Sequence, residues 1–113
     1  MSETRYSVYV IDLQDDVMDN RRMREANPGY MPGSPCVYVG STAHKPEKRF
    51  AQHRRGGKLS NRYVHQYGLR LRDSDADAVA TWDHSFATRM EAEDSEASIS
   101  NCLREAGWAV WSH

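Results

Sequence analysis

The sequence predicts a mixed α/β (α+β) domain that contains both strands and helices. Two short segments, residues 6–11 and 36–40, are rich in valine and tyrosine, which favour extended strands. A longer segment, residues 89–106, places apolar residues at helical spacing behind a helix-capping signal. Since 113 residues fit one compact domain, we expect these elements to form a single domain over residues 1–113.

The first strand is expected over residues 6–11, where β-branched and aromatic residues run up to the turn-prone Asp12. A long connection follows, at about residues 15–35. Within it, residues 17–25 are compatible with a short helix, whereas the prolines and glycines of residues 27–35 indicate an irregular loop. We therefore expect a loop-rich connection between the first two strands.

The second strand is expected over residues 36–40, and a helix is expected after it, over residues 46–54. Pro46 is favourable in the first turn of that helix, because the N–H that proline lacks has no helical partner there. A glycine pair ends the helix. A further short helix is expected to begin at Ser60, a candidate N-cap residue, and to end with Gly68 in the C′ position.

A third strand is expected over residues 79–86. At the start of the last helix, Thr88 and Glu91 match a capping box, and Gly107 supplies a C-terminal stop. Beyond this helix, residues 108–111 are expected to form either a short edge strand or a docked tail.

Glu96 interrupts the apolar stripe of the last helix. Ala92, Ile99 and Leu103 recur along that stripe, and Glu96 occupies the place between the first two of them. A charged carboxylate on a buried stripe requires a compensating cation. That cation is either a divalent metal ion or a basic side chain, unless the carboxylate reaches solvent at the edge of the core.

Arg49 and His53 lie four residues apart on an expected helix, so their side chains project from the same face. A guanidinium matches phosphate oxygens with paired hydrogen bonds, and a nearby imidazole can donate a hydrogen bond or transfer a proton near neutral pH. Two interpretations remain open for this face: a phosphate site, or an ordinary solvated surface among other basic residues.

Tyr9 and Tyr38 each lie in the middle of an expected strand, between two valines. Because side chains alternate along a strand, each tyrosine points away from its valine neighbours. If the two strands pair, the two hydroxyl groups could meet on one face. Packing in the core is the other interpretation of both tyrosines.

Charge is segregated along the chain, although the formal net charge is only −1. Residues 44–72 are rich in lysine and arginine and contain Glu47 as their single acidic residue. In residues 73–96 the balance reverses: the charged residues there are acidic except Arg89, histidines aside. A basic stretch of this kind either binds nucleic-acid phosphates or forms a solvated helix face.

Several classes of protein are disfavoured. Cys36 and Cys102 lie far apart and outside any metal-ligand spacing, which is typical of reduced thiols in the cytosol. The N-terminus lacks a signal-peptide pattern, and no stretch approaches the roughly 18 consecutive apolar residues of a membrane span. We therefore expect a cytoplasmic protein with no membrane partner. A metal protein built on the histidines and cysteines is also disfavoured, because no pair has a recognised ligand spacing.

Several of these features occur in a characteristic order. Residues 7–9 (Ser-Val-Tyr) and 38–40 (Tyr-Val-Gly) are followed by Arg49 and His53 on one helix and by Glu96 on a later one. In this order the chain resembles the GIY-YIG nuclease superfamily from end to end. Each short triplet is unspecific alone, whereas the joint order of the five features is specific.

The resemblance implies a small central antiparallel sheet of about three strands flanked by helices. It also implies a metal-dependent endonuclease that hydrolyses phosphodiester bonds in DNA. Glu96 would bind one Mg²⁺ or Mn²⁺ ion, and Arg49 would clamp the scissile phosphate. Tyr9 or Tyr38 would orient or deprotonate the attacking water, and His53 would assist as a hydrogen-bonding group or a base.

DNA is the partner that the resemblance implies, and a second protein is expected to supply specificity. The basic residues that flank the expected site should contact the DNA backbone with little sequence preference. These residues are Lys45, Lys48, Arg54, Arg55, Lys58 and Arg62.

Three departures from the family pattern favour an alternative hypothesis. Ser7 replaces the glycine of the first triplet, and the connection at about residues 15–35 has the length of an insertion. Residues 107–111 also lack the asparagine that many members carry after the glutamate helix. The alternative is a catalytically weak or inactive domain of the same fold that binds nucleic acid or a protein partner.

Overall fold

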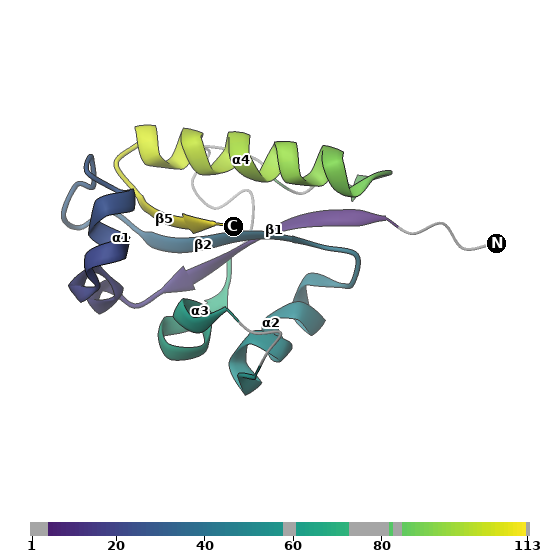
Figure 1. Ribbon diagram of the computed structural model, residues 1–113, viewed down its shortest axis with the longest axis horizontal. Coiled ribbons are helices and arrows are strands. Elements are labelled where there is room, and N and C mark those ends of the chain that lie inside the picture. Colours follow the sequence, from purple (N-terminus) through teal and green to yellow (C-terminus); the bar gives the residue numbers. More distant parts are fainter. Residues whose placement is uncertain (1–4, 58–60, 73–81, 83–84, 113) are drawn as a thin grey trace.

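One sheet lies between two groups of helices in this computed structural model, which describes residues 5–57, 61–72, 82 and 85–112 (Figure 1). The strands of these residues are β1 (Tyr6–Leu13), β2 (Cys36–Thr42), β3 (Gly68–Leu71), β4 (Ser85–Phe86) and β5 (Ala109–Ser112). They form one five-stranded sheet in the order β3-β1-β2-β5, and β4 also pairs with β1. The expected mixture of strands and helices is therefore confirmed.

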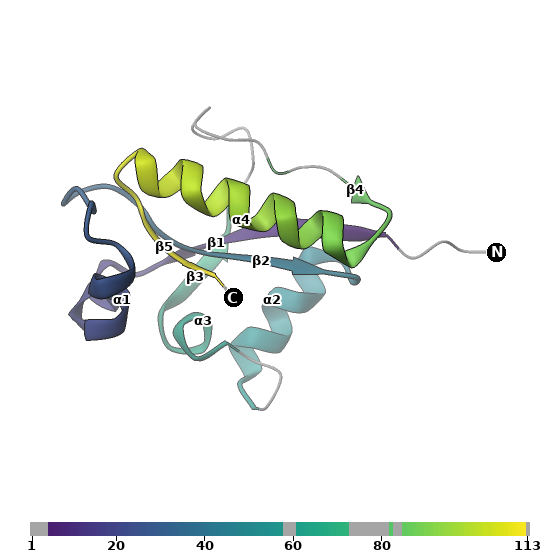
Figure 2. The ribbon, with the colours of Figure 1, turned by 45° about the horizontal axis from the view of Figure 1, so that its top comes forward.

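Helices cover both faces of this sheet. They are the 3₁₀ helix η1 (Asp15–Asp19), α1 (Arg21–Ala26), α2 (Pro46–Arg55), α3 (Arg62–Tyr67) and α4 (Arg89–Glu105). Figure 2 shows α4 along one face of the sheet, with α2 and α3 on the opposite face. Among the described residues, no helix is both long enough and apolar enough to cross a membrane.

The alternation of side chains along β1 divides the core in two. Val8 and Val10 pack on the α4 side, in a cluster that includes Leu103. Tyr9 belongs to the opposite cluster, with Val64 of α3. The first two strands therefore lie where the sequence predicts them, with both faces buried.

The sheet differs from the expected antiparallel sheet of about three strands. It has five strands in the described residues, and it is mixed, because β5 runs parallel to β2 with Val110 opposite Val37. Residues 109–112 are thus an edge strand and not a docked tail. Apolar residues on β5 pack into both core clusters, which accounts for its place beside β2.

The sequence does not predict β3. Helix α3 ends at Gly68 as expected, but Gly68 has a φ of −64° and leads directly into β3. Arg70 of β3 and Arg72, just after β3, both contact Asp12 of β1, at 3.1 and 2.6 Å. These long-range ion pairs hold β3 against β1, and their partner lies far away in the sequence.

The helix boundaries follow local signals. Pro46 begins α2, and Thr88 accepts a hydrogen bond from the backbone N–H of Glu91, as the capping box predicts. The N-cap of α3 is Asn61, whereas Ser60 lies outside the described residues. Of the strand expected over residues 79–86, β4 is described and the remaining positions, apart from Trp82, lie outside the described residues.

The connection between β1 and β2 is held to β5 by one buried side chain. Its expected helix is present as the short pair η1 and α1. Asn27, at the end of α1, donates through Nδ2 to the backbone oxygens of Met23 and Val110, at 2.9 and 3.0 Å. Its Oδ1 accepts from the Val110 N–H at 2.8 Å. The segment is therefore docked to the sheet through hydrogen bonds between the Asn27 side chain and the backbone of β5.

Candidate functional site

Tyr9, Tyr38 and His53 form a buried cluster between the sheet and α2. The Tyr9 hydroxyl lies 2.9 Å from Nε2 of His53. The ring of Tyr38 meets the imidazole edge to face, with centroids 5.4 Å apart, and the two tyrosine rings lie 6.1 Å apart. The hydroxyl groups and the imidazole predicted from separate segments are thus brought together, although packing in the core also holds for both tyrosines.

The hydrogen bonds of His53 determine its tautomer. The backbone N–H of Asn61 donates to Nδ1 at 2.8 Å, so Nδ1 carries no hydrogen. In the neutral imidazole the hydrogen then lies on Nε2, which donates to the Tyr9 hydroxyl oxygen. His53 therefore supports negative charge on Tyr9 instead of accepting a proton from it.

Gly40 gives the two tyrosines room. It pairs with Tyr9 across the β1–β2 ladder. A Cβ atom at Gly40 would lie 2.6 Å from the Tyr9 hydroxyl oxygen and 2.9 Å from the Tyr38 ring, too close for either ring to keep its place. The glycine of the second triplet is therefore required by the packing of both tyrosines, a contact that the sequence alone does not predict.

Burial and nearby charges alter the acidity of both phenols. Burial raises the pKa of Tyr9 to about 12, although the charge and a hydrogen bond of Arg49 lower it. Burial also raises the pKa of Tyr38, and the proximity of Tyr9 and Glu96 raises it further. Both phenols are therefore protonated at neutral pH, and Tyr9 is the easier of the two to ionise.

Arg49 projects from α2 beside this cluster. Its side chain is half-buried, and its Nη1 donates to Oε1 of Gln52 at 3.0 Å. The charge of Arg49 lowers the pKa of both tyrosines, and a hydrogen bond with Arg49 lowers the pKa of Tyr9 further. The expected guanidinium and imidazole thus belong to one site, and His53 is fully buried, so the interpretation as a solvated face is wrong for His53.

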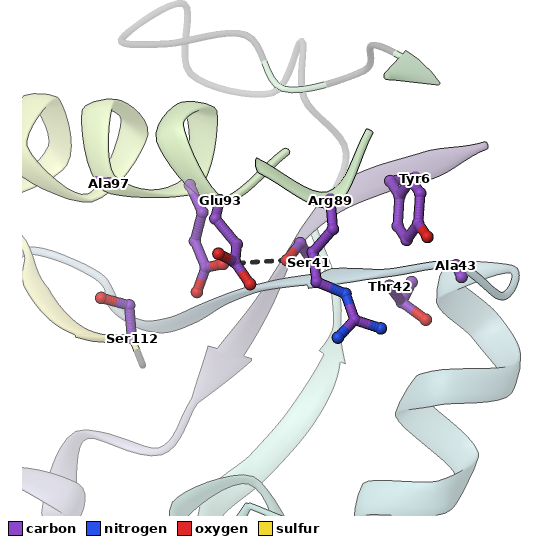
Figure 3. Close-up of a pocket in the computed structure, with 9 residues that line it drawn as sticks. Tyr6, Ser41, Thr42, Ala43, Arg89, Glu93, Ala97 and Ser112 are labelled. Atoms are coloured by element: carbon purple, nitrogen blue, oxygen red, sulfur yellow. Dashed lines mark hydrogen bonds between the residues drawn. The ribbon is translucent and has the colours of Figure 1, made fainter. Parts of the chain in front are cut away.

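Glu96 is buried on α4 with an exposed fraction of only 5%, as its position in the apolar stripe predicts. Its Oε2 accepts a hydrogen bond from the hydroxyl of Ser41 on β2, at 3.1 Å. Glu96 also lines a pocket of about 400 Å³ between the start of α4 and the end of β2. Figure 3 shows this pocket, with Glu93 and Arg89 projecting from α4 toward Ser41.

The oxygen donors of this pocket suit a hard divalent cation. The carboxylates of Glu93 and Glu96 and the hydroxyls of Ser41 and Thr42 all line it. Among the described residues, no group of three or more histidine, cysteine, aspartate or glutamate side chains is arranged to hold a metal. A cation would thus take one or two carboxylates from the protein and its other ligands from water and substrate, as Mg²⁺ does with phosphate substrates.

Basic side chains lie on the α2 and α3 side of the molecule. Apart from the half-buried Arg49, the lysines and arginines described there are exposed: Lys45, Lys48, Arg54, Arg55 and Arg62. Lys58 lies outside the described residues. Arg70 and Arg72, from the same basic stretch, contact Asp12, so part of its charge is neutralised within the fold.

No family model, curated protein or solved structure matches the chain. The site itself therefore carries the functional conclusion. Sequence reasoning missed two of its supporting residues, Ser41 and Asn61, and recorded Gly40 only as part of the second triplet, without its packing role. Ser41 follows that triplet directly and could have been examined as its extension, whereas nothing in the sequence links Asn61 to His53.

Proposed function

We propose that the protein is a metal-dependent endonuclease of the GIY-YIG type that hydrolyses phosphodiester bonds in DNA. The observation that carries the proposal is a set of five chemically suited side chains from four separate elements, four of them clustered between the sheet and α2 and the fifth, Glu96, buried on the α4 side, from where its charge raises the pKa of both tyrosines. They are Tyr9 of β1, Tyr38 of β2, Arg49 and His53 of α2, and Glu96 of α4. Phenols, a guanidinium and a buried carboxylate together meet the needs of phosphoryl transfer.

Glu96 would hold one Mg²⁺ or Mn²⁺ ion, with Glu93 beside it in the pocket. The ion, when bound, supplies positive charge that neutralises the phosphate and stabilises the leaving oxygen. Arg49 would bind the non-bridging oxygens of the same phosphate and stabilise the charge that develops on them. Its half-buried position strengthens this interaction, because water screens it less.

Tyr9 is the residue that we propose to deprotonate the attacking water. Nε2–H of His53 donates to its hydroxyl oxygen, and the charge of Arg49 is close, so both groups stabilise the phenolate. Tyr38, whose pKa is raised by burial and further by the proximity of Tyr9 and Glu96, stays protonated and orients the water. His53 is then a positioning residue, which Asn61 holds in the donating tautomer.

Exposed basic residues on α2 and α3 would contact the DNA backbone around this site, giving affinity that falls steeply with salt. The candidates described by the structure are Lys45, Lys48, Arg54, Arg55 and Arg62. Lys58, which lies outside the described residues, is proposed with them from its place in the sequence. Contacts of this kind position the substrate and carry little sequence information. Specificity would come from a protein partner.

The test is to incubate the purified protein with supercoiled plasmid, single-stranded DNA and structured DNA, in Mg²⁺, in Mn²⁺ and in chelator. We expect nicking that requires a divalent metal and that Glu96→Gln abolishes. Metal-dependent nicking that survives Glu96→Gln would contradict the assignment. Salt-sensitive binding without cleavage in either metal would favour the noncatalytic nucleic-acid-binding domain.

A further inference from the structure

The pocket beside Glu96 has walls of opposite charge. Arg89 lies in the first turn of α4, and Glu93 lies one turn later on the same side. Both side chains are exposed and both line the pocket of about 400 Å³ (Figure 3). Over the described residues neither of them forms an ion pair, so their charges do not neutralise each other by direct contact.

Arg89 has an unfavourable place in its helix. The N-terminus of a helix carries partial positive charge, which favours acidic side chains and disfavours a cation there. Arg89 is nevertheless held in this position by Tyr6, whose ring centroid lies 6.0 Å from the guanidinium carbon. Tyr6 is itself anchored in the sheet, because it pairs with Phe86 of β4. The guanidinium is thus oriented by β1 at the edge of the pocket.

The charge pattern restricts what can occupy this pocket. An anion alone would be repelled by Glu93 and Glu96, whereas a divalent cation would be attracted by these two carboxylates and would leave the charge of Arg89 without a partner ion. A nucleic-acid strand with a bound divalent cation complements both charges of the pocket. The cation would bind the carboxylates of Glu93 and Glu96, and a backbone phosphate would bind the guanidinium of Arg89.

We propose that Arg89 binds a second phosphate of the substrate strand, adjacent to the phosphate that is cleaved, and that Tyr6 is its positioning residue. This inference rests on the proposed nuclease function. It names the substrate class as a strand that continues past the scissile bond, because a strand that ends there offers no phosphate to Arg89. The site would therefore favour internal phosphodiester bonds over terminal ones.

The binding test uses fluorescein-labelled oligonucleotides, single-stranded and duplex, with anisotropy measured over a series of salt concentrations in Ca²⁺. Loss of one phosphate contact in Arg89→Gln should weaken binding about 5- to 10-fold and reduce the slope of log K against log salt by roughly 0.7 to 0.9. Arg89→Lys should retain part of the affinity, because it keeps the charge. The matched control is Arg22→Gln on α1, an exposed arginine that does not line the pocket and should change neither value.

The position of the contact is tested by a neutral methylphosphonate placed, one at a time, at the phosphates next to the cleaved bond. At one of these positions the wild-type KM should rise about 5- to 10-fold, whereas the same modification should have less than about a twofold effect on Arg89→Gln. The kcat should change little, because Arg89 does not touch the reacting atoms. Tyr6→Leu should reproduce part of the KM effect, and its thermal unfolding is measured alongside to show that the variant folds.

The outcomes separate this inference from the nuclease proposal. If the wild type cleaves and Arg89→Gln matches Arg22→Gln in salt slope and in its response to methylphosphonates, Arg89 binds no phosphate and only this inference fails. If the wild type binds without cleaving and Arg89→Gln lowers the slope, the phosphate contact stands and the nuclease proposal fails. A wild-type protein without salt-dependent oligonucleotide binding overturns both.

Discussion

Tyr9 is held between a hydrogen-bond donor and a cation, which makes its ionisation the step most sensitive to pH. Its pKa is raised by burial to about 12, so below that pH the phenolate fraction grows about tenfold for each pH unit. We expect kcat/KM to rise with pH with a slope near one on logarithmic axes between about pH 6 and 9.

Tyr9→Phe tests this assignment, because phenylalanine keeps the ring and removes the acidic hydroxyl. We expect its rate to fall by about 10²-fold or more and to lose the rise with pH. Tyr38→Phe serves as the comparison, since it should lower the rate and keep the slope. A Tyr9→Phe variant that retains the slope would show that the proton of water goes elsewhere.

Gly40 is the residue whose requirement for glycine can be measured most simply. Gly40→Ala adds a Cβ 2.6 Å from the Tyr9 hydroxyl oxygen, so the ring must move and its hydrogen bond to His53 is lost. We expect a loss of about 1–3 kcal/mol in unfolding free energy, measured in urea, together with most of the cleavage activity. Gly29→Ala is the matched control, because nothing lies within 4 Å of the added atom, and it should change neither property.

At the residue scale, sequence patterns identify a functional side chain when its position follows from helical or strand periodicity. They do not identify hydrogen bonds between separate segments of the chain. Glu96 could be recognised because helical spacing places it among apolar residues, and it is indeed buried. The bond from Asn61 to His53 joins a loop residue to a helix and determines a tautomer. No pattern in the sequence records such a contact.

At the scale of elements, the connection between β1 and β2 has a structural attachment that its loop-like composition does not indicate. Asn27 satisfies both backbone groups of Val110 on β5. Asn27→Ala leaves a buried N–H without its acceptor, and we expect the unfolding free energy to fall by about 2–3 kcal/mol. Asn101→Ala, at an exposed position on α4, should have an effect within about 0.5 kcal/mol.

Cleavage by Asn27→Ala should stay near the wild-type rate at temperatures well below unfolding, because Asn27 does not belong to the cluster around Tyr9. Unchanged stability with lost cleavage would instead assign the connection to substrate access.

Elements with strong local signals were predicted, and elements held by distant partners were not. The capping box of α4 and the proline of α2 are local, and both are confirmed. In contrast, β3 depends on Asp12, which lies 58 and 60 residues away from its two arginine partners. Its residues follow a helix that ends at Gly68, and no local signal indicates that the chain continues there directly as a strand.

At the scale of the whole molecule, the sheet determines which distant residues meet. The antiparallel pairing of β1 and β2 places Tyr9 opposite Gly40 and beside Tyr38, and α2 then adds Arg49 and His53. Helix α4 approaches from the other face, and Glu96 reaches Ser41 near the end of β2. The order of these residues was visible in the sequence, whereas the mixed, five-stranded sheet that joins them was not.

The central claim is that Glu96 holds the metal on which cleavage depends, and the most direct measurement is the single-turnover rate of plasmid nicking in saturating Mg²⁺. Glu96→Gln preserves the size of the side chain and removes its charge, and we expect the rate to fall by about 10²- to 10³-fold. Glu105→Gln, an exposed change at the other end of the same helix, should leave the rate unchanged. Equal rates for Glu96→Gln and Glu105→Gln would contradict the account.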